Sequence, residues 1–357
     1  MTALLIYLSF ALVGFLAMYI AYKPQCDKYE QTLNFSYAIL PLPYIYALYT
    51  LGSLTAFFLL DNTDFIETLT FWRVLVPLIF IPVMYVSCLI FSKQTAVFVI
   101  IACIALTVWM QPISDGNPYP ELPVWTLRLI IIILASIFCL GGIINNFIPH
   151  TILIPHISIL LGLSIMAFLG AAPVYTALCS AVLIGALIGY LNINFYEVKV
   201  EIDNAAAVAI SYMVCSLILL NIGEFCLPSC FILTSVFWSE LLVAVWRRLF
   251  VSHSGALAEN TNCYLAAQNL TVNALTVNML KICSIVMFIA WFQIYAINNH
   301  SLIIVSMCLT LWLSGSLSMP GGGKRTLKEI NQDFIADIKQ GINETMDILN
   351  KRHKDDE

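Results

Sequence analysis

Residues 125–146 read WTLRLIIIILASIFCLGGIINN, and this stretch decides how the chain folds. An apolar run of twenty residues, Trp125 to Ile144, ends in two adjacent carboxamides, Asn145 and Asn146. Stretches of about 20 apolar residues cross the hydrocarbon core of a bilayer as an α-helix. The run therefore predicts a transmembrane helix with an unusual polar pair at its end. Two aspartates there would suggest a metal-ion site, whereas two asparagines keep the shape and lose the charge.

The composition of the whole chain is typical of a membrane protein. Of its 357 residues, 61% are hydrophobic and 10% are charged, and the mean hydropathy is +0.90. Soluble domains are about 45–50% apolar and about 25% charged, so they bury less apolar surface than this chain carries. We predict an all-α polytopic membrane protein of about eleven transmembrane helices, the fourth short enough to be re-entrant. The predicted segments are Leu4–Tyr22, Ile39–Leu60, Phe71–Phe91, Thr95–Met110, Trp125–Ile144, Thr151–Ala171, Pro173–Leu191, Ala205–Ile222, Cys226–Val245, Val277–Ile297 and Ser301–Leu317.

The basic residues are distributed unevenly across this topology. Fourteen of the sixteen lie on one side of an eleven-helix arrangement, and the exceptions are Arg73 and Arg128, just inside helix starts. Lys and Arg concentrate in cytoplasmic loops. The sequence therefore predicts a multi-pass protein of the inner (cytoplasmic) membrane, with its N-terminus outside and its C-terminus in the cytoplasm. It has no basic, aromatic-laced stretch that would suggest a nucleic-acid partner.

We expect three parts along the chain. Residues 1–319 form the transmembrane domain, and residues 320–323, PGGG, form a hinge. Residues 324–357 predict an amphipathic cytoplasmic helix, because apolar residues recur there at steps of three and four. That helix docks on the protein's own cytoplasmic loops, on the membrane surface, on a protein partner or on a second copy of itself. Its apolar face consists of Leu327, Ile330, Phe334, Ile338, Ile342, Met346 and Leu349.

Two smaller features concern cysteine and histidine. Cys226 and Cys230 flank a proline on the predicted outer side, where they form either a disulfide or two buried thiols. His150 and His156 flank a predicted short turn, which the Pro149–Pro155 spacing favours, and we expect them to be helix-end residues. No Cys/His spacing resembles a zinc site, so we predict no metal ligands of that kind.

Several polar segments fall on the predicted cytoplasmic side. They are the pair Asn145-Asn146, the loop Asn192–Asn204 and the loop Arg247–Asn262. Each of them opens or closes a predicted helix. Their convergence on one side of the membrane predicts a binding or catalytic site there.

The order and spacing of these segments resemble the polyprenyl-phosphate N-acetylhexosamine-1-phosphate transferases, which initiate peptidoglycan and O-antigen synthesis. Residues 141–146, GGIINN, are similar to the Gly-x-x-Asp-Asp that ends a helix in that family. Residues 189–195, GYLNINF, followed by Lys199, resemble the family's Gly-Phe-Leu-x-x-Asn-Phe-x-x-x-Lys-Ile. Asp203-Asn204 fall at the family's Gly-Asp, with the acid one place early.

The resemblance continues downstream and covers most of Leu4 to Leu317. Glu240 matches the family's Asp before its Arg-Arg pair, which falls on Arg247-Arg248. Glu259 matches the Asp of the family's Ser-Pro-Phe-x-x-Asp. The resemblance implies a site at Asn145, Asn146, Asp203, Asn204 and Glu259, and substrate-binding roles for Asn194, Lys199, Glu240, Arg247 and Arg248.

The family's chemistry needs acids that this chain lacks. In the family, aspartates hold Mg²⁺ at the diphosphate of a UDP-sugar while polyprenyl phosphate attacks and UMP leaves. Here the Asp-Asp positions are asparagines, and residues 147–188 contain no Asp or Glu. The family's His-x-His-His falls on residues 262–265, NCYL. We therefore expect a catalytically degenerate scaffold without a cofactor, which binds a membrane lipid such as polyprenyl phosphate and supports or regulates envelope glycan assembly.

Other interpretations of the same residues remain open. A divergent, active transferase would use Mg²⁺ with Asp203, Glu201, Glu240 or Glu259. An unrelated transporter or secretion-complex subunit would use the C-terminal helix as its docking element. Asn145-Asn146 would have a purely structural role if the pair only caps the end of its helix. Glu240 would then be a carboxylate that reaches the interface or an ion-pair partner of the Arg247-Arg248 pair, which would only set topology.

Overall fold

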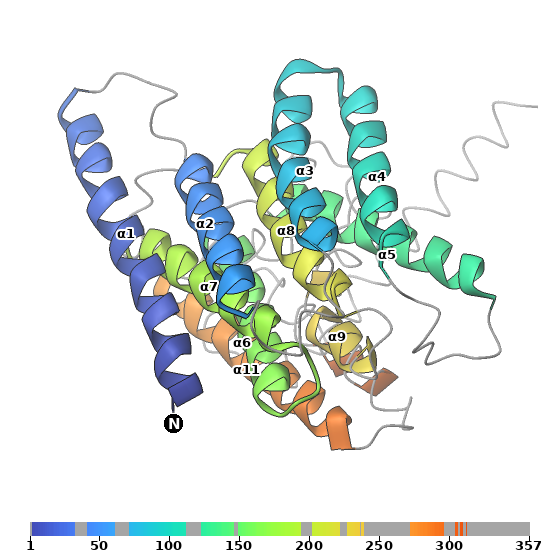
Figure 1. The fold of residues 1–357 in the computed structure, drawn as a ribbon. Coiled ribbons are helices and arrows are strands. Elements are labelled where there is room, and N and C mark those ends of the chain that lie inside the picture. Colours follow the sequence, from blue (N-terminus) through green and yellow to red (C-terminus); the bar gives the residue numbers. More distant parts are fainter. Residues whose placement is uncertain are drawn as a thin grey trace, which may run out of the picture.

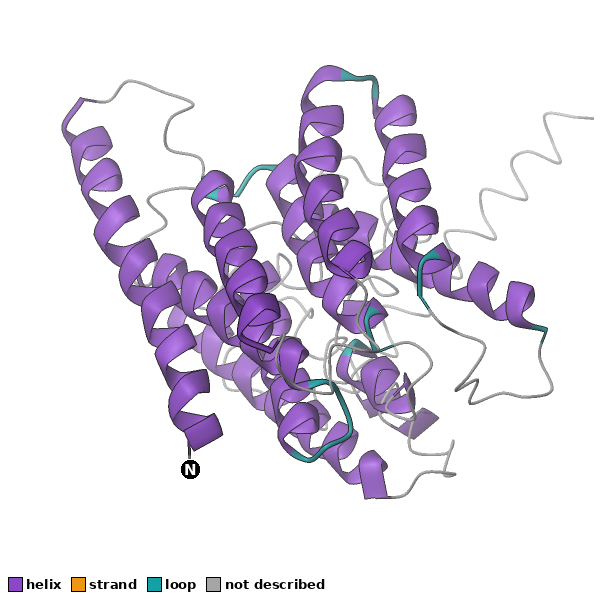
Figure 2. Ribbon diagram, viewed as in Figure 1, coloured by secondary structure: helices purple, strands orange, loops and turns teal. Residues whose placement is uncertain are grey.

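A computed structural model shows an all-helical protein (Figures 1 and 2). The structure describes residues 2–32, 41–60, 71–111, 123–145, 149–193, 202–221, 227–235, 237–238, 272–295, 304–305, 308–309 and 312. Across these ranges it has helices and no β-strand, as the sequence predicts. The helices are α1 (Thr2–Thr32), α2 (Leu42–Leu60), α3 (Phe71–Ile90), α4 (Lys93–Trp109), α5 (Val124–Asn145), α6 (Pro149–Phe168), α7 (Val174–Ile193), α8 (Asn204–Leu219), α9 (Leu227–Leu233) and α11 (Val272–Tyr295).

Several of these helices have the length and composition of membrane spans. Four other apolar helices, within α4, α6, α8 and α11, are shorter. The prediction of an all-helical fold is thus confirmed for the described residues, and these long apolar helices suggest a membrane protein. The count of eleven spans, their orientation and the particular membrane remain predictions. Within the described ranges, five helices are long and apolar enough to cross a membrane: Leu4–Pro24, Leu42–Leu60, Trp72–Ile90, Val124–Ile143 and Val174–Ile193.

Several helix boundaries differ from the prediction; α11, for example, begins at Val272 and not at Val277. Two other differences concern α1 and α6. Helix α1 continues past Tyr22 to Thr32, so its length of about 46 Å exceeds the thickness of a bilayer core. Helix α6 begins at Pro149, so the predicted turn between Pro149 and Pro155 is wrong. Proline is favoured at the first position of a helix, because the N–H that it lacks would have no partner there. The predicted hinge at 320–323 and the helix at 324–357 lie outside the described residues.

Small residues bring α1 and α7 into close contact. A Cβ atom added at Gly185 would overlap the carbonyl oxygen of Ala11, and one added at Gly14 would overlap that of Val182. Gly189 lies against Met18 further along. Residue numbers rise together on both helices, so α1 and α7 run in the same direction, side by side in Figure 1. Small residues allow this approach, which is how helices gain packing energy where lipid provides no hydrophobic drive.

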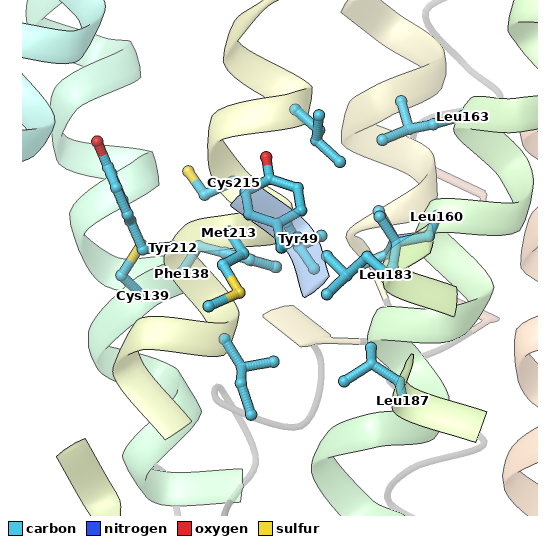
Figure 3. Close-up of a cluster of buried hydrophobic side chains, with 14 of the residues drawn as sticks. Tyr49, Phe138, Cys139, Leu160, Leu163, Leu183, Leu187, Tyr212, Met213 and Cys215 are labelled. Carbon is cyan, nitrogen blue, oxygen red and sulfur yellow. The ribbon is translucent and has the colours of Figure 1, made fainter. Parts of the chain in front are cut away.

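Helix α8 lies at the centre of the bundle. Every residue from Ala205 to Leu217 is buried, so this helix has no face open to lipid among those residues. A helix that is apolar all round belongs in an interior. The surrounding core takes side chains from α2, α5, α6, α7 and α8 (Figure 3).

Four polar side chains of α8 and its cap bond to four different helices. Ser211 bonds His156 of α6 at 3.1 Å, and Tyr212 bonds Thr107 of α4 at 2.6 Å. Ser216 bonds Tyr49 of α2 at 3.2 Å. Asp203, just before α8, accepts a hydrogen bond from a tyrosine of α3. These bonds fix the position of α8 relative to each neighbour, where apolar packing alone would allow sliding.

A test of the α1–α7 contact uses Gly185→Leu. The leucine side chain would meet the α1 backbone at Ala11, so α1 must move away. We expect the free energy of unfolding to fall by about 2–3 kcal/mol, as for other overpacked cores. Unfolding of the detergent-solubilised protein in SDS measures this change. The control is Ile188→Leu on the exposed face of the same helix, 40% exposed, which should leave stability unchanged. Equal stability of both variants would contradict the contact.

Candidate functional site

Three of the ten residues predicted for the site lie in the described part of the chain. Asn145 is the last residue of α5, Asp203 precedes α8, and Asn204 is the first residue of α8. Of Asn145 only this backbone position is described, and Asn204 is exposed. The other seven lie outside the described residues and stay predictions: Asn146, Asn194, Lys199, Glu240, Arg247, Arg248 and Glu259.

Asp203 is the N-cap of α8. Its Oδ1 accepts a hydrogen bond at 2.5 Å from the backbone N–H of Ala206, and its backbone is extended, as a cap requires. Its Oδ2 accepts a longer hydrogen bond, 3.4 Å, from the hydroxyl of Tyr85 near the end of α3. One carboxylate oxygen therefore caps α8, and the other links the start of α8 to α3.

Gly142 brings the end of α5 to the first turns of α8. A Cβ atom at Gly142 would overlap the hydroxyl of Ser211 and would lie 3.1 Å from the carbonyl oxygen of Ala207. Asn145 follows three residues later, so the backbone of Asn145 and the start of α8 belong to the same end of the bundle. We name this the Asp203 end, formed by the ends of α3 and α5 and the start of α8; it lies uppermost in Figure 1.

The two glycines of the resembling motifs thus have packing roles. The absence of a side chain at Gly142 lets Ser211 of α8 pack closely there, and Gly189 does the same for Met18 of α1. A glycine required for helix contact needs no ligand to explain it. The part of the resemblance carried by these two positions therefore has a structural explanation that is independent of substrate binding.

His156 lies behind the Asp203 end, fully buried in the second turn of α6. Its Nδ1 lies 2.5 Å from the carbonyl oxygen of Ile152, and its Nε2 lies 3.1 Å from Ser211 Oγ. The rings of Phe138 and Phe237 lie 5.6 and 5.7 Å from the imidazole. The expectation of a helix-end residue is wrong for His156, because this histidine lies inside α6 and its side chain is buried.

The described residues hold no metal site. Asp203 is the only carboxylate among the side chains that the structure describes, and none of those residues form a group of three metal-ligating side chains. Cys230 is a free, buried thiol, so it forms no disulfide. The chemistry at the described part of the Asp203 end is hydrogen bonding and capping.

An apolar crevice lies between α5, α8 and α9. Its cavity volume is about 60 Å³, and it opens at the surface of the bundle. On α5 it runs from Ile131 to Phe138, so its nearer end lies about 10 Å along the helix from Asn145. Sequence reasoning missed this crevice, because only the folded arrangement of three helices creates it. Its other walls are formed by α8, α9 and residues that follow α9, and they include Cys215, Leu219, Cys230, Thr234 and Trp238.

No protein-family model matches the chain, and no curated protein matches it.

The capping role of Asp203 can be separated from a charge role. Asp203→Ala removes the acceptor for Ala206 N–H and should lower the free energy of unfolding by about 1 kcal/mol. Asp203→Asn keeps a side-chain oxygen that caps nearly as well, so it should stay within a few tenths of wild type. Thermal unfolding in detergent measures both. A large loss in Asp203→Asn would show that the charge matters beyond the cap.

The Gly142–Ser211 contact predicts a second-site rescue. Gly142→Ala should lower the melting temperature, because the new Cβ atom meets Ser211 Oγ. Adding Ser211→Ala removes that oxygen and should restore part of the loss, although the single variant Ser211→Ala itself loses the bond to His156. The double-mutant cycle should give a coupling of about 1 kcal/mol. Simple additivity of the two changes would contradict the contact.

Proposed function

We propose that this protein binds a membrane lipid with a long apolar chain and a phosphate headgroup, on a scaffold resembling the polyprenyl-phosphate sugar-1-phosphate transferases, without catalysing the transfer. Its biological role is then to present or sequester that lipid during assembly of envelope glycans. The lipid class follows from the resemblance, and the described geometry supports binding without chemistry.

The observation that carries the proposal is the state of Asp203. It is the one acid that the chain retains at a described motif position, and both of its oxygens already accept hydrogen bonds from Ala206 and Tyr85. A Mg²⁺ ion at this carboxylate would have to share an oxygen with one of these hydrogen bonds or replace it. At Oδ1 the ion would compete with the cap of the central helix, and at Oδ2 it would compete with the hydroxyl of Tyr85.

The crevice supports the lipid part of the proposal. Its lining is almost wholly apolar, and its α5 side lies within a helix of membrane-spanning length, where lipid chains are the available occupants. A chain lying along α5 from Ile131 towards Asn145 would bring its headgroup to the Asp203 end. The headgroup would there meet the polar loops that the sequence places on that side.

The enzymatic question has a direct assay. Purified protein is incubated with Mg²⁺, UDP-N-acetylhexosamines and polyprenyl phosphate, and released UMP is measured. We expect no UMP above the background of a heat-denatured sample. Mg²⁺-dependent release of UMP would overturn the inactive assignment and establish the divergent transferase in its place.

Lipid binding is tested by filling the crevice. Ala135→Phe adds a ring to the α5 wall and should weaken binding of a photoreactive polyprenyl phosphate at least about tenfold, a loss of about 1.4 kcal/mol. The matched control is Ile133→Phe, two residues away on a side chain 49% exposed outside the crevice. Unchanged crosslinking of Ala135→Phe, with a melting temperature equal to that of the control, would remove the crevice from the proposal.

A further inference from the structure

Five buried polar side chains from three helices lie together in the bundle interior. They are Tyr49 and Ser53 of α2, Tyr175 and Cys179 of α7, and Ser216 of α8, and each is 3% exposed or less. We call them the α2–α7–α8 polar cluster. No motif of the sequence singles them out, because hydroxyls and thiols scattered in apolar helices are common.

Contacts within the cluster connect all three helices. The Tyr49 hydroxyl lies 3.2 Å from Ser216 Oγ, which joins α2 to α8. The Tyr175 hydroxyl interacts with Cys179 on its own helix and with Ser53 and Tyr49 across the interface. The next turns of α2 and α7 are also close to each other, since a Cβ atom at Gly52 would lie 2.6 Å from the Val182 side chain. The cluster is therefore a rigidly bounded interior site.

Ser53 is the unusual member of the cluster. Its hydroxyl is buried and has no hydrogen bond of good geometry with any protein atom, although Tyr49, Tyr175 and Cys179 all lie within interaction range. Serine and threonine in a helix commonly bond the carbonyl four residues back, as Thr55 does at 2.7 Å. Ser53 does not do so. Leaving a buried hydroxyl unsatisfied is costly, the more so at membrane depth.

We propose that the α2–α7–α8 polar cluster is an internal water site, in which bound water bridges Ser53 to the hydroxyl and thiol groups of Tyr49, Tyr175 and Cys179. A buried water needs about two to four polar partners, and the cluster offers that number. All of its members are neutral, and no anionic oxygen is among them, so a neutral hydrogen-bonding ligand fits better than a cation. The water extends the Tyr49–Ser216 link to α7.

The sign of a stability change tests the site. Removing a hydroxyl that bonds bound water should destabilise the fold, whereas removing an unsatisfied hydroxyl should leave it unchanged or stabilise it. We expect Ser53→Ala to lower the melting temperature by about 2 °C or more. The control is Ser136→Ala in α5, also a buried hydroxyl without a protein partner but outside the cluster. A Ser53→Ala variant as stable as wild type, or more stable, would overturn the proposal.

Radiolytic hydroxyl labelling with mass spectrometry detects the water itself. Radicals generated from bound water modify neighbouring side chains that bulk solvent does not reach. Tyr49 and Tyr175 should be labelled despite their burial, whereas Tyr212, equally buried but bonded directly to Thr107, should stay unlabelled. Absence of label on Tyr49 and Tyr175, like that on Tyr212, would overturn the site.

A cation bound in the cluster, in place of water, would make the melting temperature depend on the salt that is present. The melting temperature of the wild-type protein is measured in sodium, potassium and choline chloride at equal ionic strength. A water site predicts the same value in all three salts. A sodium-specific or potassium-specific increase that Ser53→Ala removes would replace water with a bound cation and so overturn the proposal.

Discussion

The structure depends on fixing one helix in an interior that is apolar on every side. Helix α8 is surrounded by other helices, and apolar contacts alone would not determine how far it slides or turns. The directional bonds of Ser211, Tyr212 and Ser216 to α6, α4 and α2 remove that freedom. Asp203 sets the start of the helix by capping it. Each such interhelical hydrogen bond contributes only modestly to the free energy of folding, and its main effect is to fix the position of α8 along its neighbours.

Glycine contacts work with these bonds at the same helices. Gly142 lets α5 approach Ser211, so the residue that bonds His156 also receives the α5 backbone. Gly185 and Gly14 likewise allow the backbones of α1 and α7 to approach closely. Close backbone approach and directional bonding together give a bundle in which few helices can move alone. At the Asp203 end, contacts of both kinds hold the start of α8, which bonds α3 through Asp203 and meets α5 at Gly142.

The sequence predicted the helices well and their arrangement poorly. Apolar runs located α1 to α8, because the length and composition of a span are local properties. The central place of α8 was not predictable, since lipid-facing and core-facing positions are both apolar and no periodic pattern separates them. Pairs such as Thr107–Tyr212 join residues 105 apart in the chain, which no local pattern indicates. For the site, the sequence identified Asp203 but not its cap or its bond from Tyr85.

The capping role of Asp203 also bears on the kind of ligand that its surroundings favour. The N-terminus of a helix carries a partial positive charge and unpaired N–H groups, which favour an anion and disfavour a cation. At α8 that field already acts on the Asp203 carboxylate, whose Oδ1 accepts the Ala206 N–H. A Mg²⁺ ion at Asp203 would work against the helix field and compete with the cap, and Asn145 and Asn204 bring no charge to offset that cost. In the binding function that we propose, a lipid phosphate would be held by groups other than Asp203, because the carboxylate at the start of α8 carries the same sign of charge as the phosphate.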